Sequence, residues 1–211
     1  VVERLVPDLP IVYTLHHERD EQLSDFYRWF PRVQFIAISE DQRKREVPLP
    51  HVDVVHHGLD PAKYAATRSS EDYVCCVGRF SCIKGVHTAI DVAATAGVPI
   101  RVGGDVHEQD REWADEELSR RLAQPHVTHL GPIGLDVKAS LLQRARALLM
   151  PIEWNEPFGL IMIEAMRILD LVASRDEKAL LFVEARAMQA ALTEILQRRY
   201  NLPDPPLVIN G

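Results

Sequence analysis

The sequence predicts an α/β protein built on a doubly wound parallel sheet, with a partial second α/β domain at its amino terminus. Short apolar runs alternate with amphipathic stretches along most of the chain, which is the pattern of parallel strands joined by crossover helices. Glycine-marked loops follow several of the apolar runs. In a doubly wound sheet such loops lie together beyond the carboxyl ends of the strands, so we expect a ligand site at that edge.

Residues 1–64 are expected to form the partial domain and a hinge. Apolar runs predict strands, polar runs with helical spacing predict helices, and Ser39 suits the N-cap of the second helix. The expected strands are 11–15, 35–38 and 52–55, and the expected helices are 21–30 and 40–46. A polar stretch over 65–72 has the composition of a linker, so we place the domain boundary between residues 64 and 65.

Residues 65–211 are expected to form the second domain, in which strand and helix signals alternate again. The expected strands are 73–77, 98–102, 127–130 and 147–150. The expected helices are 86–96, 108–123, 135–144, one beginning near residue 156, and a long one over 176–200.

Composition excludes several classes of protein. The chain has 211 residues, of which 46% are hydrophobic and 26% charged, enough for a substantial core. A net charge of −7 and dispersed basic residues argue against a general nucleic-acid binder. No apolar run approaches the ~18 residues of a membrane span, and charges and Pro7 near the start do not fit a signal peptide. We therefore expect a cytoplasmic protein with no integral membrane segment.

Cysteines and histidines give no sign of a disulfide framework or a metal site. Three cysteines lie close together in the sequence, and we expect them to be reduced small hydrophobic residues. They are Cys75, Cys76 and Cys82. The nine histidines include two adjacent pairs, but no H-x3-H or C-x2-C spacing accompanies them. We expect no bound metal.

The segment from Pro151 to Met166 carries the clearest chemical signal. It follows an apolar run and contains two carboxylates, Glu156 and Glu164, with seven residues between them. Pro157 suits the first turn of a helix, whose free amides can bind an anion. Those amides belong to Phe158, Gly159 and Leu160. Glu164 lies about two turns on from Glu156, on nearly the same side of the helix.

This E-x7-E element, with P-F-G-L inside it and E-A-M behind, resembles the signature of the retaining GT-B glycosyltransferases. That group, glycosyltransferase group 1 or family 4-like, includes sucrose, glycogen and phosphatidylinositol-mannoside synthases. The resemblance implies a Rossmann-like carboxy-terminal domain that binds a nucleotide-sugar donor. It implies that Glu156 lies by the donor sugar, that Gly159 and Leu160 give amides to the diphosphate, and that Glu164 binds the ribose. The alternative is an amphipathic helix with solvent-facing acids.

A second group of residues, Gly78-Arg79-Phe80 and Lys84-Gly85, resembles the diphosphate clamp of the same family. Sugar transfer leaves a diphosphate with new negative charge, which a preorganised Arg and Lys would stabilise. We therefore expect Arg79 and Lys84 to act on the leaving group, with Gly78 at the donor. The alternative for this loop is two exposed cations with no ligand.

Three weaker signals fit the same family. His16, at a strand end, resembles the His of the T-x-H element that faces the cleft, so it is a substrate-site candidate. His57 stands where the V-x-N-G-x-D hinge usually has Asn. Ile133 follows Gly131-Pro132, where the family's backbone meets the nucleotide base. For each, the alternative is a strand-end or turn residue that binds nothing.

The sequence also departs from the family. The resemblance covers residues 11–174, so only the last part of the amino-terminal domain, without its Gly-rich loop, can be present. After Met166 the usual small-Cys-Gly-Thr-Pro segment is replaced, although 171–173 could still be the corresponding strand. The apolar face of the predicted helix 176–200 could cover exposed surface, within the chain or across a homodimer.

The resemblance therefore implies a retaining transferase that moves a hexose from an NDP-sugar to an unknown acceptor, with no other cofactor. In this family the departing phosphate is credited with accepting the acceptor's proton, so no general base is assigned. A second hypothesis is a non-catalytic nucleotide-sugar binding module, or a fragment that needs a partner domain. A flavodoxin-like domain would explain the alternation but not the two motifs together.

Overall fold

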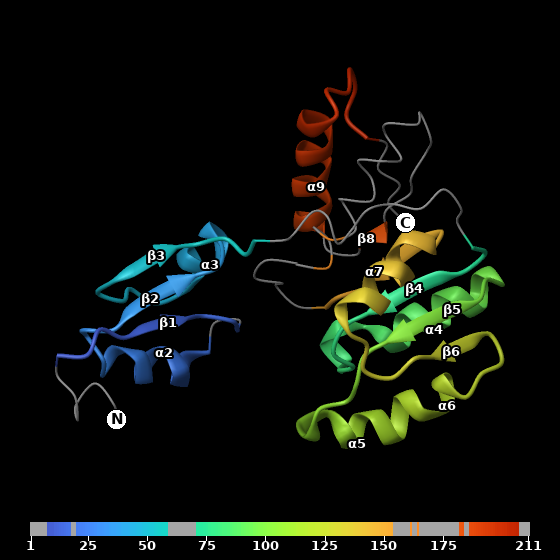
Figure 1. Ribbon diagram of the computed structural model, residues 1–211, viewed down its shortest axis with the longest axis horizontal. Helices are drawn as coiled ribbons and strands as arrows, with labels where there is room; N and C mark the ends of the chain where they lie inside the picture. The colour runs from blue at the N-terminus through green and yellow to red at the C-terminus, as the bar shows by residue number, and fades with distance from the viewer. Residues whose placement is uncertain are drawn as a thin grey trace. The chain divides into compact units, whose positions relative to one another are not determined.

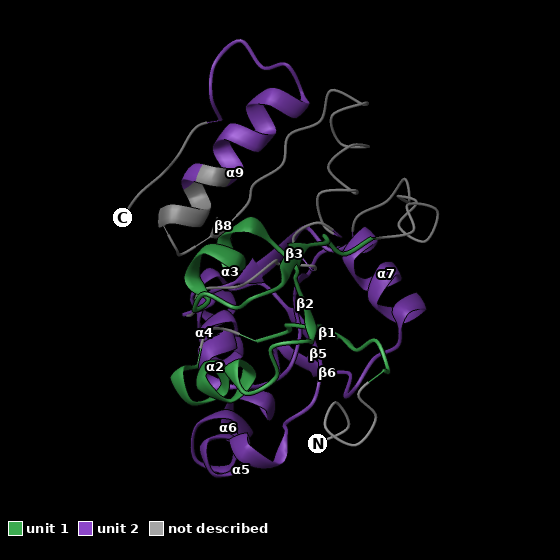
Figure 2. Cartoon of the chain, turned by 90° about the vertical axis from the view of Figure 1, so that its left-hand side faces the viewer, with its two compact units in different colours: residues 1–59, 155–160 green, residues 60–154, 161–211 purple. Residues whose placement is uncertain are grey.

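The computed structural model describes residues 8–17, 20–58, 71–153, 161, 164, 182–183 and 186–206. These residues divide into two compact units (Figure 2). Described residues up to 58 belong to the first unit, and those from 71 onward to the second. The expected boundary between residues 64 and 65 falls outside the described residues, so the domain bounds remain a prediction.

The first unit is a three-stranded parallel sheet with two connecting helices (Figure 1). The strand order is β1-β2-β3, and β1 pairs with β2 and β2 with β3 in parallel. The strands are β1 (Val12–Thr14), β2 (Gln34–Ala37) and β3 (Val52–Val54), and the helices are α2 (Glu21–Arg28) and α3 (Glu40–Arg45). The expected alternation of strands and helices is confirmed here.

Side-chain caps and one buried amide shape the first unit. Ser39 caps α3 as expected, accepting a hydrogen bond from the amide of Gln42 at 3.0 Å. The buried Gln42 amide group accepts a bond from Ile38 N at 2.9 Å and donates to the carbonyls of Leu15 and His17 at 3.2 and 2.9 Å. It thereby ties the end of β1 to the end of β2.

The second unit contains a five-stranded parallel sheet of order β6-β5-β4-β7-β8 (Figure 1). Its strands are β4 (Val74–Val77), β5 (Ile100–Gly103), β6 (Val127–His129), β7 (Ala147–Met150) and β8 (Phe182–Val183). The chain runs outward from β4 through β5 to β6, and then returns to the other side of β4 as β7. This reversal of strand order confirms a doubly wound sheet, with its switch point between β4 and β7.

Helical segments cover both faces of this sheet. They are α4 (Val86–Ala96), η3 (Glu108–Asp110), α5 (Arg111–Trp113), η4 (Ala114–Leu118), α6 (Ser119–Leu122), α7 (Leu135–Arg144) and α9 (Arg186–Arg199). The adjacent strand residues Cys75 and Cys76 point to opposite faces. Cys76 packs with residues of α4 and η4, whereas Cys75 packs with residues of α7. The sheet is therefore the middle of three layers.

The cysteines partly match expectation, since all three are free thiols. Burial raises the pKa of Cys76 to about 12 and also raises the pKa of Cys75, so both thiols stay neutral at physiological pH. Cys82, unlike the other two, is exposed. It lies in the turn after β4 instead of on the strand.

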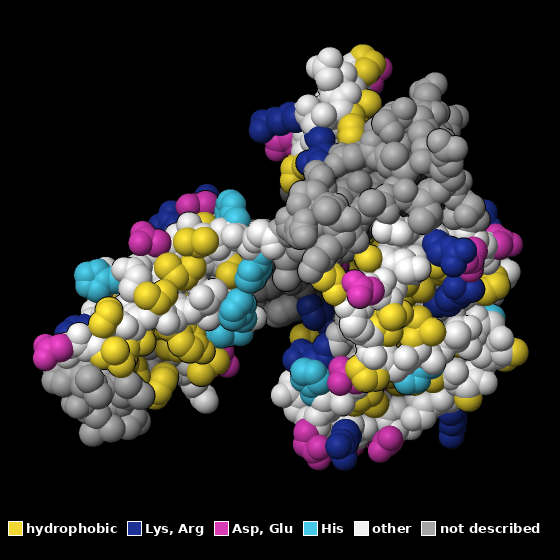
Figure 3. Space-filling model, in the orientation of Figure 1, with side chains coloured by type: hydrophobic (Ala, Val, Ile, Leu, Met, Phe, Trp, Pro, Cys, Tyr) yellow, Lys and Arg dark blue, Asp and Glu magenta, His cyan; other side chains and the backbone are white. Residues whose placement is uncertain are grey.

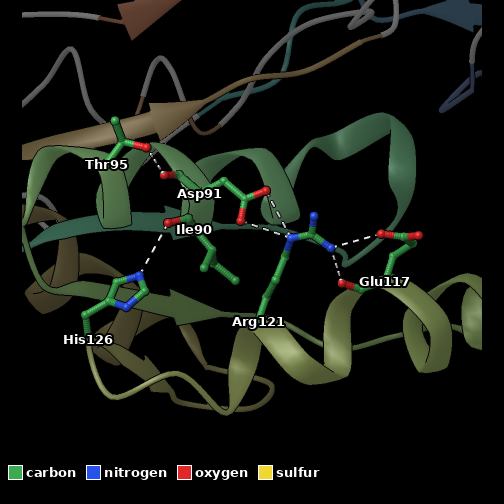
Figure 4. Close-up of polar contacts among 6 residues, drawn as sticks. All are labelled: Ile90, Asp91, Thr95, Glu117, Arg121 and His126. Carbon is green, nitrogen blue, oxygen red and sulfur yellow. Dashed lines mark hydrogen bonds and ion pairs between the residues drawn. The ribbon is translucent and has the colours of Figure 1, made fainter.

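Polar contacts join α4 to the helical segments below it (Figure 4). Arg121 Nε donates to both carboxylate oxygens of Asp91 at 3.0 Å, and its Nη1 donates to Glu117 Oε2 at 3.0 Å. The bonds to Asp91 and then to Glu117 raise the pKa of Arg121. Nearby, the ring of His126 lies 3.4 Å from the carbonyl of Ile90. These exposed contacts fix helix orientation more than they add stability.

The long helix expected over 176–200 is wrong in its first part. Phe182 and Val183 form β8, which pairs with Leu149 and Met150 of β7, and α9 begins only at Arg186. A short apolar run fits a buried strand as well as a helix, and here its pairing with β7 makes it a strand. Residues 171–173, the other candidate for this strand, lie outside the described residues.

Two further expectations concern the charged segment and the membrane. Residues 108–122 are helical but broken into 3₁₀, α and π pieces instead of one helix. In the described part of the chain, no helix is long and apolar enough to span a bilayer. On the face drawn in Figure 3, acidic and basic side chains of the second unit are interspersed.

Candidate functional site

Two loops meet in direct backbone contact at the switch point of the second sheet. One follows β4 and runs to Gly85, and the other follows β7 from Pro151. A Cβ atom at Gly85 would lie 1.9 Å from the carbonyl oxygen of Pro151, and Gly85 has a φ of +69°. The amide of Glu153 donates to the carbonyl of Ile83 at 2.9 Å. Only glycine allows this approach at position 85.

The loop after β5 closes the other side of Gly78. Gly78 N donates to the carbonyl of Gly103 at 3.0 Å, and Phe80 N donates to the carbonyl of Asp105 at 2.8 Å. A Cβ atom at Gly104 would lie 1.9 Å from the carbonyl oxygen of Gly78. The Phe80 side chain is buried. The backbone on both sides of Arg79 is therefore fixed by its neighbours.

Ile133 lies against the same edge of the sheet. A Cβ atom at Gly103 would lie 2.4 Å from Ile133 Cδ1, and the carbonyl of Gly131 accepts a hydrogen bond from Gly104 N at 2.8 Å. The loop after β6 thus packs directly on the end of β5. Gly78, Arg79, Lys84 and Ile133, which the sequence predicted separately, all come from loops at one edge of this sheet.

Arg79 has an acidic neighbour that sequence reasoning missed. Its Nε atom lies 3.8 Å from Asp110 Oδ2, and the two side chains are 31% and 17% exposed. Both atoms are buried, and neither has a hydrogen-bond partner in the described part of the chain. Asp110 lies in a charged run, H-E-Q-D-R-E, which by itself is typical of a solvated helix face.

Lys84 ends a 3₁₀ turn, η2 (Cys82–Lys84), directly before Gly85. Its amide donates to the carbonyl of Ser81 at 3.2 Å, and its side chain is half-buried. Ser81 is 1% exposed, and its hydroxyl has no hydrogen-bond partner among the described residues. The turn therefore combines a cation, a buried hydroxyl and the close approach at Gly85.

Glu164 is buried, and its charge is met by a lysine. Glu164 Oε1 accepts a hydrogen bond from Lys138 Nζ at 2.6 Å, and the two side chains are 4% and 25% exposed. Lys138 lies on α7, which begins just after Ile133. Sequence reasoning missed this lysine, since nothing distinguishes it from other polar residues of an amphipathic helix. The pair links the second acid of E-x7-E to the first part of α7.

The other predicted residues of the E-x7-E element lie outside the described residues. They are Glu156, Phe158, Gly159 and Leu160.

In the first unit, exposed His16 follows β1, and its ring stacks on that of His57, with centroids 5.3 Å apart and planes 8° apart. The two histidines singled out in the first unit are thus neighbours. Within the described residues, no three His, Cys, Asp or Glu side chains are grouped as metal ligands would be.

The sequence matches a known family over more than half of the chain. The model of the family described as glycosyl transferases group 1 matches residues 63–178. The chain therefore belongs to this family. A search among curated proteins finds no match.

Solved structures agree on the GT-B fold. HepE from Anabaena, in complex with UDP-glucose, has a TM-score of 0.67 and 18% identity, covering 95% of this chain and 65% of its own. Sucrose-phosphate synthase from Thermosynechococcus elongatus has a TM-score of 0.63 and 18% identity, covering 92% and 60%. AviGT4, a glycosyltransferase of avilamycin A biosynthesis, has 0.52 and 22%, covering 82% and 54%. The chain spans less than two thirds of the length of these proteins, which are GT-B glycosyltransferases.

The contact at Gly85 predicts a specific cost for one added methyl group. Gly85→Ala should lower the free energy of unfolding by more than the about 1–2 kcal/mol that a left-handed conformation costs alanine. The additional loss arises because its Cβ atom meets the backbone of Pro151. Gly97→Ala is the matched control, since Gly97 has a φ of +66° with nothing within 4 Å of its Cβ position. Urea unfolding of both variants measures the difference. Equal losses would contradict the close contact.

The buried pair predicts that Lys138→Met destabilises the second unit. Removing the ammonium takes this ion pair from the buried Glu164 carboxylate, which should lower the free energy of unfolding by about 1–3 kcal/mol. The loss is moderate because Lys138 is itself partly exposed. Adding Glu164→Gln should recover part of that loss. Thermal and urea unfolding measure both variants, with the exposed Lys44→Met as control. A double variant no more stable than Lys138→Met would contradict the coupling.

Proposed function

We propose that the chain binds a nucleotide-sugar donor and forms the donor half of a retaining glycosyltransferase that transfers a hexose. The observation that carries this proposal is the joining of the β4, β5 and β7 loops around Arg79 at the switch point. Ligands of doubly wound folds bind at that point. The UDP-glucose complex of HepE supports a nucleotide-sugar ligand.

Five described residues of the second unit have roles in this proposal. Arg79 and Lys84 bind the diphosphate and stabilise the charge that develops on it as the leaving group. Gly78 lets the phosphates approach the backbone. Glu164 accepts hydrogen bonds from the ribose hydroxyls, and the backbone at Ile133 meets the base.

The remaining roles rest on the family resemblance. Glu156 orients the donor sugar, and the amides of Phe158, Gly159 and Leu160 bind the diphosphate at the start of a helix. His16 contacts the substrate from the first unit. These roles belong to the same proposal as the clamp.

In the proposed reaction the acceptor hydroxyl oxygen bonds to the anomeric carbon as the bond from that carbon to the diphosphate oxygen breaks. The departing phosphate takes the hydroxyl proton, so the chain supplies no general base. Attack and departure on the same face retain the anomeric configuration. Arg79 and Lys84 contribute where charge appears, because a preorganised cation needs no reorganisation during the step. We further propose that this takes place in the cytoplasm, with no bound metal.

A second candidate function is a nucleotide-sugar binding module that needs a partner for transfer. It is favoured because the chain spans between 53% and 65% of HepE. Holding the acceptor against the donor can supply about 7–11 kcal/mol of a barrier. Product formation from a sugar nucleotide by the 211-residue chain separates the two candidates, and we expect binding with little or no transfer.

The apolar face of α9 is covered either within the chain or across a homodimer. In α9, Leu192 and Leu196 are buried within the chain, whereas Ile195 is 46% exposed. Burial of the first two favours cover inside the chain. We propose that Ile195 belongs to a dimer contact, and light scattering tests whether the chain forms a dimer.

The diphosphate clamp predicts a loss of affinity without a loss of fold. Arg79→Ala and Lys84→Ala should each weaken binding of a nucleoside diphosphate by about 1.5–3 kcal/mol, or roughly 10- to 150-fold, because each removes a charge-assisted bond. Titration calorimetry with UDP, GDP and ADP measures this. Arg111→Ala is the control, because Arg111 is exposed and paired with Glu108. Unchanged affinity in both clamp variants would refute the assignment.

The two glutamates predict different ligand dependences. Glu164→Gln should weaken binding of the nucleoside diphosphate by about tenfold, because its proposed partner is the ribose. Glu156→Gln should leave that affinity unchanged and weaken only the intact sugar nucleotide. Calorimetry with each ligand on each variant makes the comparison. The same pattern in both variants would undo the division of roles.

A further inference from the structure

The ion pair between Arg79 and Asp110 has a geometry that stability alone does not explain. The distance of 3.8 Å from Nε to Oδ2 is too long for a hydrogen bond but short enough for a strong charge interaction. Both atoms are buried, with no hydrogen-bond partner among the described residues. Buried charged groups without hydrogen bonds cost free energy. Such an arrangement calls for another explanation.

The backbone holds both partners in place. Phe80 N bonds to the carbonyl of Asp105, and Phe80 and Val106 form an isolated parallel bridge. Asp110 N bonds to the carbonyl of His107 at 2.9 Å. The loops after β4 and β5 are thus connected beside both residues, so the carboxylate stands at a defined place next to the guanidinium.

The chemistry of arginine gives this arrangement a use. A guanidinium presents its donors in a fixed plane, and two of them can bind two phosphate oxygens at once. Asp110 lies on the Nε side of Arg79. With the carboxylate at Nε, a phosphate would bind through the terminal pair, Nη1 and Nη2, and a side chain held at Nε loses less entropy when it binds one.

We propose that Asp110 is a positioning residue for Arg79 and strengthens diphosphate binding through it. This inference rests on the proposed function of the same loop. The alternative is that the Asp110 carboxylate repels a bound diphosphate and weakens its binding. Removing the charge of Asp110 lowers affinity if Asp110 orients Arg79, and raises affinity if repulsion is its main effect.

The test is Asp110→Asn, which keeps the shape and removes the charge. Titration calorimetry uses UDP, GDP and ADP, and the comparison is made with the one that the wild-type chain binds best. We expect affinity to fall by about tenfold, within the range of coupled charge pairs. In the Arg79→Ala background the same substitution should have no further effect. Glu108→Gln, an exposed acid of the same turn, should leave affinity unchanged.

Several outcomes overturn the proposal. Higher affinity in Asp110→Asn would show repulsion, and equal losses with and without Arg79 would show an effect through the fold. Unchanged affinity would remove the role of Asp110 while leaving the proposed function intact. A wild-type chain that binds none of the three diphosphates would overturn the proposed function and this role with it.

A measurement without ligand tests the pair itself, and the outcome that would overturn the proposal needs only the wild-type chain. The Nε–Hε signal of Arg79 in a ¹⁵N spectrum is assigned by its loss in Arg79→Lys. In the wild-type chain we expect this proton to exchange with water more slowly than that of exposed Arg111, and faster in Asp110→Asn than in the wild type. Exchange as fast as that of Arg111 in the wild-type chain would overturn the proposal.

Discussion

Close backbone contact at the switch point of the five-stranded sheet is the constraint on which the site depends. The loop after β4 touches the segment after β7 at Gly85 and the loop after β5 at Gly104, and neither position has room for a Cβ atom. These contacts fix the backbone that carries Arg79 and Lys84. The clamp that we propose would therefore need little rearrangement when charge develops on a ligand.

Two ion pairs lie at this edge of the sheet, one formed by Arg79 and the other by Glu164. Around Arg79, a cation is balanced by Asp110 at a distance that forms no hydrogen bond. Around Glu164, a buried carboxylate is balanced by Lys138 through a short hydrogen bond. A nucleotide sugar carries anionic phosphates next to a neutral, hydroxyl-bearing ribose. In the proposed site, the phosphates lie on the Arg79 side and the ribose on the Glu164 side of this edge.

Much of the fold follows from the sequence, because local patterns and the switch-point rule act together. The expected helices 86–96 and 135–144 have the bounds of α4 and α7, since apolar spacing marks both, with a glycine at each end of α4 and before α7. β8 was missed because an apolar run is ambiguous until its neighbour is known. Gly78, Arg79 and Ile133 could be predicted from motifs at strand ends. Asp110 and Lys138 could not, because their roles arise from contacts between loops distant in sequence.

The most direct test of the account is a titration of the ¹⁵N-labelled chain with a nucleoside diphosphate, followed by backbone amide shifts. We expect the largest shifts on residues 78–85, 103–106 and 131–134, the loops at the carboxyl edge of the second sheet. The strands of the first unit should show little change. Shifts that are absent, or that concentrate on β1 to β3, would contradict the claim that this edge is the nucleotide site.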